Sequence, residues 1–315
     1  MNNQSILHYH RKNLLHSLLL LTGMLFLLSL TGWLIAGSIG IAMALGAGTL
    51  LVLTAPRLSP RLILYLYDAH IVHPRQSPQL TEIITWLTQQ SHLNKQPQFY
   101  YIPSSVMLAF SVGMKNDTAI AISDGLLRQL NIREITAVLA HEISHIQSKD
   151  LWVMAVADIM SRLTSLMAMT AYLMLFFYIP LFIFQNHPIP WLLLLLLITA
   201  PSISAIMQLA LSRTREFNAD IQAIKLTRDP AGLISALNKI NYYEKNLLKK
   251  LLLPNLRETS PSLLRTHPLT RERIQRLQSI EQNNHSPFIH PHGINNFHNT
   301  KPKRTPRHHF SGLWH

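Results

Sequence analysis

Long apolar runs alternate with polar segments along the chain. Four runs lack any Asp, Glu, Lys or Arg, and they cover residues 14–30, 33–55, 163–184 and 191–211. A helix needs about 20 consecutive, mostly apolar residues to cross the hydrocarbon core of a bilayer. Because the runs form two close pairs, we predict two transmembrane hairpins, with turns at Gly32 and near Asn186.

A signal peptide or buried soluble helices would also produce apolar runs. A cleavable signal peptide could produce the first run, but a second run follows it immediately, which a removed leader does not explain. Helices buried in a soluble core could produce the third and fourth runs, but both are longer than such helices normally need to be. Membrane spans account for all four runs.

Basic residues flank the predicted hairpins at their open ends and are absent from both turns. Loops on the cytoplasmic side of a membrane carry an excess of Lys and Arg. We therefore expect both termini and the segment between the hairpins to be cytoplasmic. The flanking residues are Arg11, Lys12, Arg57 and Arg61 for the first hairpin, and Lys149, Arg162, Arg213 and Arg215 for the second.

The polar segments carry the periodicity of short helices and strands. Apolar residues at helical spacing predict helices, and short β-prone runs bounded by turn residues predict strands. The predicted helices cover residues 79–90, 132–147, 231–253 and 268–282, with the fourth apolar run continuing as helix to about 227, and the predicted strands cover 99–102, 107–112 and 119–123. These elements indicate an α-rich α+β integral membrane protein with four transmembrane helices and a small sheet.

Composition agrees with a membrane protein and restricts its chemistry. Hydrophobic residues make up 48% of the 315 residues and charged residues 14%, and mean hydropathy is +0.15. The net charge of +13, from 28 basic and 15 acidic residues, could indicate binding to nucleic acid or to an anionic membrane surface, but the predicted spans favour loops that follow the positive-inside bias. The chain contains no cysteine, so any metal must be held by His and carboxylate side chains.

A candidate metal site lies on the predicted helix 132–147. His141, Glu142 and His145 form the pattern H-E-x-x-H, in which a spacing of four brings both imidazoles to one helix face. Such a pair can bind one zinc ion. Glu142 lies beside that face, where its carboxylate can take a proton from a zinc-bound water and later deliver it to a leaving amine.

A catalytic zinc also needs a third protein ligand. Residues 212–220 (S-R-T-R-E-F-N-A-D) provide Glu216 as that ligand and Asp220 four residues later on the same face. We expect Asp220 to accept a hydrogen bond from the N–H of a ligating imidazole and so to fix its orientation.

At these residues the chain resembles the HtpX-type membrane metalloproteases, relatives of the CAAX-prenyl endopeptidases. The resemblance rests on residues 119–130, 137–150 and 212–220, and on Thr266, His267, Pro268, Arg273 and Ile274. It implies a gluzincin fold in the bacterial inner membrane and ATP-independent cleavage of damaged or misfolded membrane proteins. It therefore also implies polypeptide substrates and a role in stress response and envelope quality control.

The resemblance also implies residue roles. His141, His145 and Glu216 would hold one zinc ion per chain, Glu142 would be the general base, and Asp220 would support a ligand. His267 and Arg273 would face the transition-state oxyanion or position the substrate, although packing or capping is an equal alternative for His267.

One position departs from the family. Members of the family that the chain resembles usually have Asn-Ala-Phe on the strand beside the active site, whereas this chain reads Leu108, Ala109 and Phe110. Leu cannot form the hydrogen bonds of an amide. If the family Asn binds the substrate backbone, Leu108 weakens that binding, and Leu108→Asn would raise turnover.

We therefore expect five parts in the chain. These are an N-terminal transmembrane hairpin (1–55), a first protease part with the H-E-x-x-H helix (56–150), a second hairpin (151–211), a second protease part with the third ligand (212–282), and a disordered basic tail rich in His, Pro and Asn (283–315).

Two alternative functions remain at this point. A zinc-binding membrane scaffold without proteolytic activity would use the same ligands but would not need Glu142 as a base. A transporter would use Asp158 and Arg162, which lie at the edge of the third apolar run and not at its middle.

Overall fold

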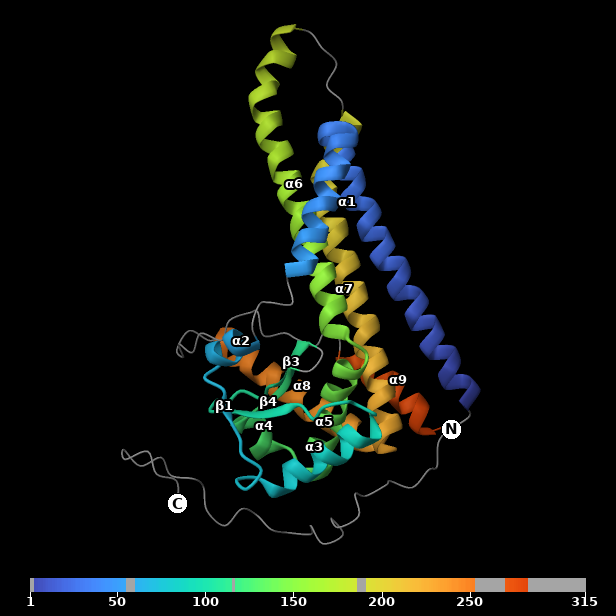
Figure 1. Ribbon diagram of the computed structural model, residues 1–315, viewed down its shortest axis with the longest axis vertical. Coiled ribbons are helices and arrows are strands. Elements are labelled where there is room, and N and C mark those ends of the chain that lie inside the picture. The colour runs from blue at the N-terminus through green and yellow to red at the C-terminus, as the bar shows by residue number, and fades with distance from the viewer. Residues whose placement is uncertain (1–2, 55–59, 115–116, 186–190, 253–269, 283–315) are drawn as a thin grey trace, which may run out of the picture.

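A bundle of long helices stands on a smaller part built from a sheet and shorter helices (Figure 1). The computed structural model describes residues 3–54, 60–114, 117–185, 191–252 and 270–282. The predicted turn near Asn186, His267 and the tail 283–315 lie outside these residues.

The bundle consists of α1 (Asn3–Thr54), α6 (Asp150–Gln185) and α7 (Trp191–Thr227), which pack against one another. In the described part of the chain, three helices are long and apolar enough to cross a membrane, and their spans are Asn13–Leu53, Asp150–Phe177 and Leu194–Thr227. Large apolar side chains such as Phe26 and Phe176 point outward from the bundle. An apolar outer surface is what a bilayer requires.

Helix α1 folds back on itself. Its backbone leaves the helical region at Ala36 and Gly37, where Gly37 has a φ of 58°, a left-handed conformation that glycine adopts without a steric penalty. The two arms then run side by side, and the backbones of Gly32 and Gly40 approach so closely that neither position has room for a side chain. The hairpin is as expected, but the predicted turn at Gly32 is wrong because Gly32 lies where the arms touch.

The sheet contains four strands in the order β1-β2-β4-β3. Their bounds are His70–Ile71 for β1, Gln98–Ile102 for β2, Ala109–Met114 for β3 and Asp117–Ser123 for β4. Strands β2 and β4 are parallel, whereas β3 is antiparallel to β4 and forms an edge of the sheet. The three predicted strands are confirmed with small shifts in their ends, while β1 is too short to produce a periodic signal.

Shorter helices pack around the sheet and around α5. They are α2 (Pro60–Leu66), α3 (Pro78–Gln90), α4 (Asp124–Gln129), α5 (Ile132–Gln147), α8 (Pro230–Leu252) and α9 (Thr270–Gln282). Along β4, Ile120 and Ile122 face the main core with α3, α5 and α8, whereas Ala119 and Ala121 face a smaller cluster that contains Leu64 of α2. This alternation is the period of two expected for a strand buried on both faces.

Helix α5 begins with a capping box. The side chain of Asn131 accepts a hydrogen bond from the backbone N–H of Glu134, and the Glu134 carboxylate accepts one from the N–H of Asn131. Ser235 and Lys239 of α8 also donate to this carboxylate, at 2.6 and 2.7 Å. One buried acid therefore fixes both the start of α5 and its packing against α8.

Candidate metal centre

Three side chains converge between α5 and α7. The Nε2 atoms of His141 and His145 are 3.1 Å apart, and the carboxylate oxygens of Glu216 lie 3.5 Å from the first and 3.6 Å from the second. All three side chains are buried. Their ligand atoms lie within 4.8 Å of one another, so a single ion can contact all three.

Local structure explains this convergence. Apolar residues at helical spacing, such as Ile135, Leu139 and Ile143, pack α5 into the main core and leave His141 and His145 on one face of the helix. Helix α7 continues from the bundle without a break and lies beside α5, which brings Glu216 to that face. The site therefore depends on one helix that belongs both to the bundle and to the part that contains the sheet.

The donor set fits zinc. Zinc bonds to imidazole nitrogen and carboxylate oxygen at about 2.0–2.2 Å, which in a tetrahedral site puts ligand atoms roughly 3.3–3.5 Å apart. The measured separations of 3.1, 3.5 and 3.6 Å bracket that range. Two neutral imidazoles and one carboxylate are also the ligand types found in catalytic zinc sites.

Each imidazole contacts a carboxylate through Nδ1, the ring nitrogen that does not point at the other ligand atoms. Nδ1 of His141 lies 3.0 Å from Oδ1 of Asp220, as the sequence predicted for one of the ligands. Nδ1 of His145 lies 2.9 Å from Oδ2 of Asp150, a partner that the sequence did not predict. These contacts place the proton of each neutral ring on Nδ1 and direct both Nε2 atoms toward the common point.

Two arginines complete the site. Arg273 of α9 donates to both Asp220 oxygens, at 2.7 and 2.8 Å, and pairs with Glu216 at 2.9 Å. Arg215 donates to Asp150 at 3.1 Å. Each outer carboxylate is therefore charge-compensated. Burial alone would lower the pKa of Arg273, but the charges of Asp220, Glu216 and Glu142 outweigh it and raise that pKa above its ordinary value, so Arg273 stays protonated.

Asp150 is reached through a break between helices. Residues five apart do not share a face of one helix. Helix α5 ends at Gln147, Lys149 adopts a left-handed φ of 55°, and Asp150 begins α6, which returns its side chain to His145. An acid soon after H-E-x-x-H was the only signal available in the sequence, and the turn was not predictable from periodicity.

Electrostatics in the cluster control the protonation of His141. Burial and the Arg273 charge lower the pKa of His141, but hydrogen bonds with Asp220 and Glu216 outweigh them and raise it to about 9. A proton and a metal ion therefore compete for this imidazole at neutral pH. Glu142 is also buried, next in sequence to His141.

Sequence comparison identifies the family. The profile of peptidase family M48 matches residues 74–281, more than half of the chain. The chain belongs to peptidase family M48. The matched region contains all the residues of the cluster and every strand of the described sheet except β1.

Similar proteins include named relatives and one solved structure. The chain is 38% identical over 260 residues to a protein named protease HtpX homolog from Acaryochloris marina, covering 79% of this chain and 88% of that protein. It is 34% identical over 242 residues to another from Campylobacter concisus, covering 71% and 82%. The crystal structure of S. mikatae Ste24p is 20% identical, with a TM-score of 0.44, covering 86% of this chain and 66% of that one.

Family membership, the candidate membrane spans and the donor set lead to one conclusion. This M48 peptidase is an integral membrane zinc metalloprotease. The resemblance seen in the sequence is confirmed.

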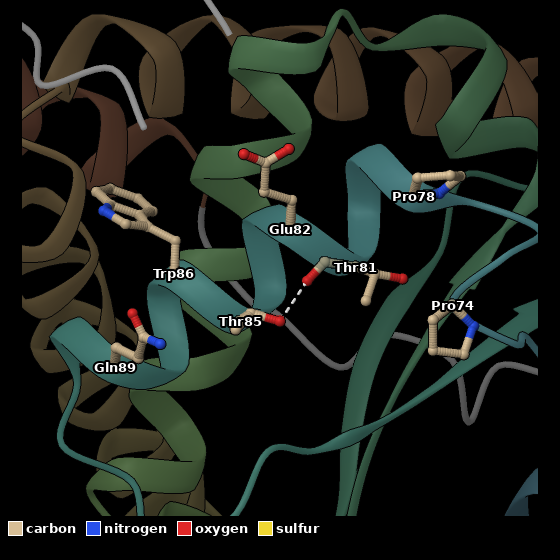
Figure 2. A pocket seen from close by; sticks show the side chains of 7 residues that line it. All are labelled: Pro74, Pro78, Thr81, Glu82, Thr85, Trp86 and Gln89. Carbon is tan, nitrogen blue, oxygen red and sulfur yellow. Dashed lines mark hydrogen bonds between the residues drawn. The ribbon is translucent and has the colours of Figure 1, made fainter. Parts of the chain in front are cut away.

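A separate groove lies away from this centre. It has a volume of about 440 Å³ and is bordered by one side of α3 and the segment before it (Figure 2). Glu82 is its sole ionisable lining residue, and Trp86, Pro74 and Pro78 are its main apolar ones. No residue of the cluster lines this groove, so it is not part of the metal centre.

Proposed function

We propose that the protein is an endopeptidase that cleaves misfolded or damaged membrane proteins at the cytoplasmic face of the membrane. The observation that carries this proposal is the buried cluster of His141, His145 and Glu216 on helices that join the membrane bundle to the protease part. In this proposal the three residues are the zinc ligands, and Glu142 is the general base.

Zinc, when bound, acts as a Lewis acid on the scissile carbonyl and lowers the pKa of a water molecule toward neutrality. The protein must then move protons. The Glu142 carboxylate accepts a proton from the attacking water and delivers it to the nitrogen of the leaving amine. Burial of Glu142 limits competition from bulk water for this carboxylate.

We propose a positioning role for Arg273 in place of the expected contact with the oxyanion. Its guanidinium is buried and forms three contacts of 2.7–2.9 Å with Asp220 and Glu216. These contacts hold a ligand and the partner of a second ligand in one geometry. His267, proposed from the sequence to act beside Arg273, keeps that assignment as a prediction because it lies outside the described residues.

Edge strand β3 is the proposed docking site for an extended substrate. It packs near α5, and its outer edge is not covered by another strand of the described sheet. An extended peptide can add to such an edge through main-chain hydrogen bonds. This binding mode accepts many sequences, which suits a protease for misfolded chains.

We propose four membrane spans with the active site on the cytoplasmic side. The return of α1 at Gly37 supports two spans within that helix, in addition to α6 and α7. Basic residues at the open ends of both hairpins support the orientation. Parts 56–150 and 212–282 then form one protease domain interrupted by the second hairpin, and the tail 283–315 is a separate segment.

The position of Glu216 supports a membrane-protein clientele. The fourth apolar run ends at Leu211, and five further residues of the same helix reach Glu216, which is roughly 7–8 Å at 1.5 Å per residue. Polypeptide segments that leave the bilayer therefore pass close to the zinc ligands.

Zinc content and cleavage of casein by the detergent-purified protein test the activity. We expect one zinc ion per chain, loss of cleavage with a chelator, and recovery when zinc is added. A protein that binds zinc but never cleaves would instead be the non-proteolytic scaffold considered above.

A further inference from the structure

Helix α2 exposes large apolar side chains outside the bundle. Four of the large apolar side chains on this seven-residue helix are exposed: Leu62 at 55%, Ile63 at 41%, Tyr65 at 82% and Leu66 at 73%. Single exposed apolar residues are ordinary on soluble surfaces, but four on two turns of one helix form a continuous patch. Leu64 is the one buried residue of this helix.

The exposed side chains share the outer face of α2. At about 100° per residue, Leu62 and Leu66 lie opposite Leu64, with Ile63 and Tyr65 on either side of them. Leu64 attaches the helix to the cluster on the sheet. Arg61 is also exposed and projects between Leu64 and Tyr65, at the margin of this arc. The arc itself is apolar, the reverse of a helix on the surface of a soluble domain.

The chain keeps α2 close to the membrane. Helix α1 ends at Thr54, and six peptide steps to Pro60 span roughly 20 Å when fully extended. Leu53, the last residue of the apolar span, is 69% exposed and belongs to the lipid-facing surface. Figure 1 shows α2 on the side of the protease part that faces the bundle.

A tryptophan marks the same side of the protein. Trp152 lies in the first turn of α6 and is 45% exposed. Tryptophan concentrates at the headgroup level of membranes. Both α2 and α6 contact strand β3, so α2 lies near the end of the bundle where α6 begins.

We propose that α2 lies in the plane of the bilayer surface, with Leu62, Tyr65 and Leu66 inserted among lipid headgroups and the upper acyl chains. An apolar helical face in the interface is stabilised by burial of its apolar area in lipid. The bundle and α2 then hold the protease part at two separate places, which fixes the tilt of the sheet relative to the membrane. This inference depends on the membrane spans and not on zinc or proteolysis.

Spin labels can measure the depth of α2 in the full-length protein. The chain has no cysteine, so each of Leu62→Cys, Leu66→Cys and Gln89→Cys carries one nitroxide. Gln89 is an exposed residue of α3 and serves as the control, because Figure 1 shows α3 on the side of the protease part away from the bundle. The proteins are placed in vesicles of phosphatidylethanolamine and phosphatidylglycerol, and zinc content checks that each variant is folded.

The collision rate of each nitroxide with oxygen, which partitions into lipid, is compared with its collision rate with a water-soluble nickel chelate. We expect the oxygen-to-nickel ratio to be higher at Leu62 and Leu66 than at Gln89. Adding Tyr65→Asp to the Leu66→Cys protein should lower the oxygen-to-nickel ratio of its label toward that at Gln89, because the charged aspartate side chain is unfavourable in lipid. Equal ratios at positions 62, 66 and 89 would overturn the proposal. So would spin–spin broadening at 62 or 66 that disappears on dilution with unlabelled protein, since a second copy would then cover α2.

Discussion

His145 and Asp150 are in contact across the break between α5 and α6, with Nδ1 of the imidazole 2.9 Å from Oδ2 of the carboxylate. Arg215 of α7 holds the other oxygen of the same carboxylate at 3.1 Å. This chain of contacts links the end of the H-E-x-x-H helix to two helices of the membrane bundle. The orientation of one proposed zinc ligand is therefore set by the packing of the bundle.

Replacing Asp150 by Asn should weaken zinc binding. The amide cannot match the charge that holds the Nδ1–H of His145 and the Arg215 guanidinium, and loss of such a partner typically lowers metal affinity about 10–100-fold. Asp158→Asn on the same helix is the matched control, because the Asp158 carboxylate has Arg162 and Gln208 as its partners and not residues of the metal cluster. Zinc affinity is measured by competition with a chromogenic chelator. Equal affinities for the two variants would contradict the role of Asp150.

Glu142→Gln should retain zinc and lose cleavage. The substitution keeps the size of the side chain but removes the proton acceptor, and loss of a general base typically costs about 100-fold to 10,000-fold in rate. Metal content and the rate of casein cleavage are measured on the same preparation. Activity near that of the wild type would remove Glu142 from the mechanism.

Glu216→Gln should show the opposite pattern. A neutral amide is a poorer zinc ligand than a carboxylate and gives no charge compensation to the dication. It also removes the charge that pairs with Arg273 at 2.9 Å. We expect zinc to be lost during dialysis against a mild chelator that leaves the wild type loaded. If this variant retained zinc as well as the wild type does, another residue would be the third ligand.

Zinc binding should release a proton from His141 and weaken at lower pH. The pKa of His141 in the metal-free protein is raised to about 9, so at pH 7 the imidazole carries a proton that zinc must displace. Below that pKa, the apparent affinity should fall about tenfold per pH unit for this one proton. Calorimetric titrations in buffers of different ionisation enthalpy measure the released protons. If zinc binding at pH 7 released no proton, His141 would not be protonated in the metal-free protein, and the prediction would be wrong.

Glu134→Gln should destabilise the contact between α5 and α8. Burial alone would raise the pKa of Glu134, but hydrogen bonds from Lys239, Ser235 and the N–H of Asn131 outweigh it and lower the pKa. Losing hydrogen bonds to a charged group costs about 1–3 kcal/mol, and partial exposure of Lys239 favours the lower end. Glu82→Gln on the exposed face of α3 is the control.

The stabilisation of the fold by the Glu134 carboxylate should decrease as the pH falls. A carboxylate whose pKa is lower in the folded than in the unfolded protein stabilises the fold above its unfolded pKa, and this stabilisation is lost as pH falls through the folded value. The difference in free energy of unfolding between the wild type and Glu134→Gln should therefore be largest at neutral pH and become smaller below about pH 4. Unfolding by denaturant in detergent measures it at each pH.

Leu108→Asn should lower stability without raising turnover. The Leu108 side chain is buried with Leu64, Ile102 and Phe110 in the cluster on the α2 side of the sheet, while the neighbouring Ala109 faces the core that contains α5. A buried amide without hydrogen-bond partners costs about 1–3 kcal/mol. The expectation that this side chain affects the substrate backbone thus loses its structural basis. Leu108→Met is the apolar control, and a folded Asn variant with faster cleavage would restore the original idea.

The sequence by itself determined the features that depend on local order along the chain. Apolar runs located the membrane helices, and helical periodicity located α5 with the same bounds, residues 132–147, that the structure has. The four-residue spacings placed His141 beside His145, and Glu216 beside Asp220, because such residues share a helix face whatever the rest of the fold does.

Tertiary structure decided which of these faces meet and what surrounds them. The turn at Lys149 brings Asp150 to His145, and the packing of α9 brings Arg273 to Asp220 and Glu216. The turn of the first hairpin lies at Gly37 and not at Gly32, because close contact between two arms is a property of their packing. Periodicity reports which side of an element is apolar. It carries no information on the partner of that side, since the partner is selected by the free energy of packing the whole chain.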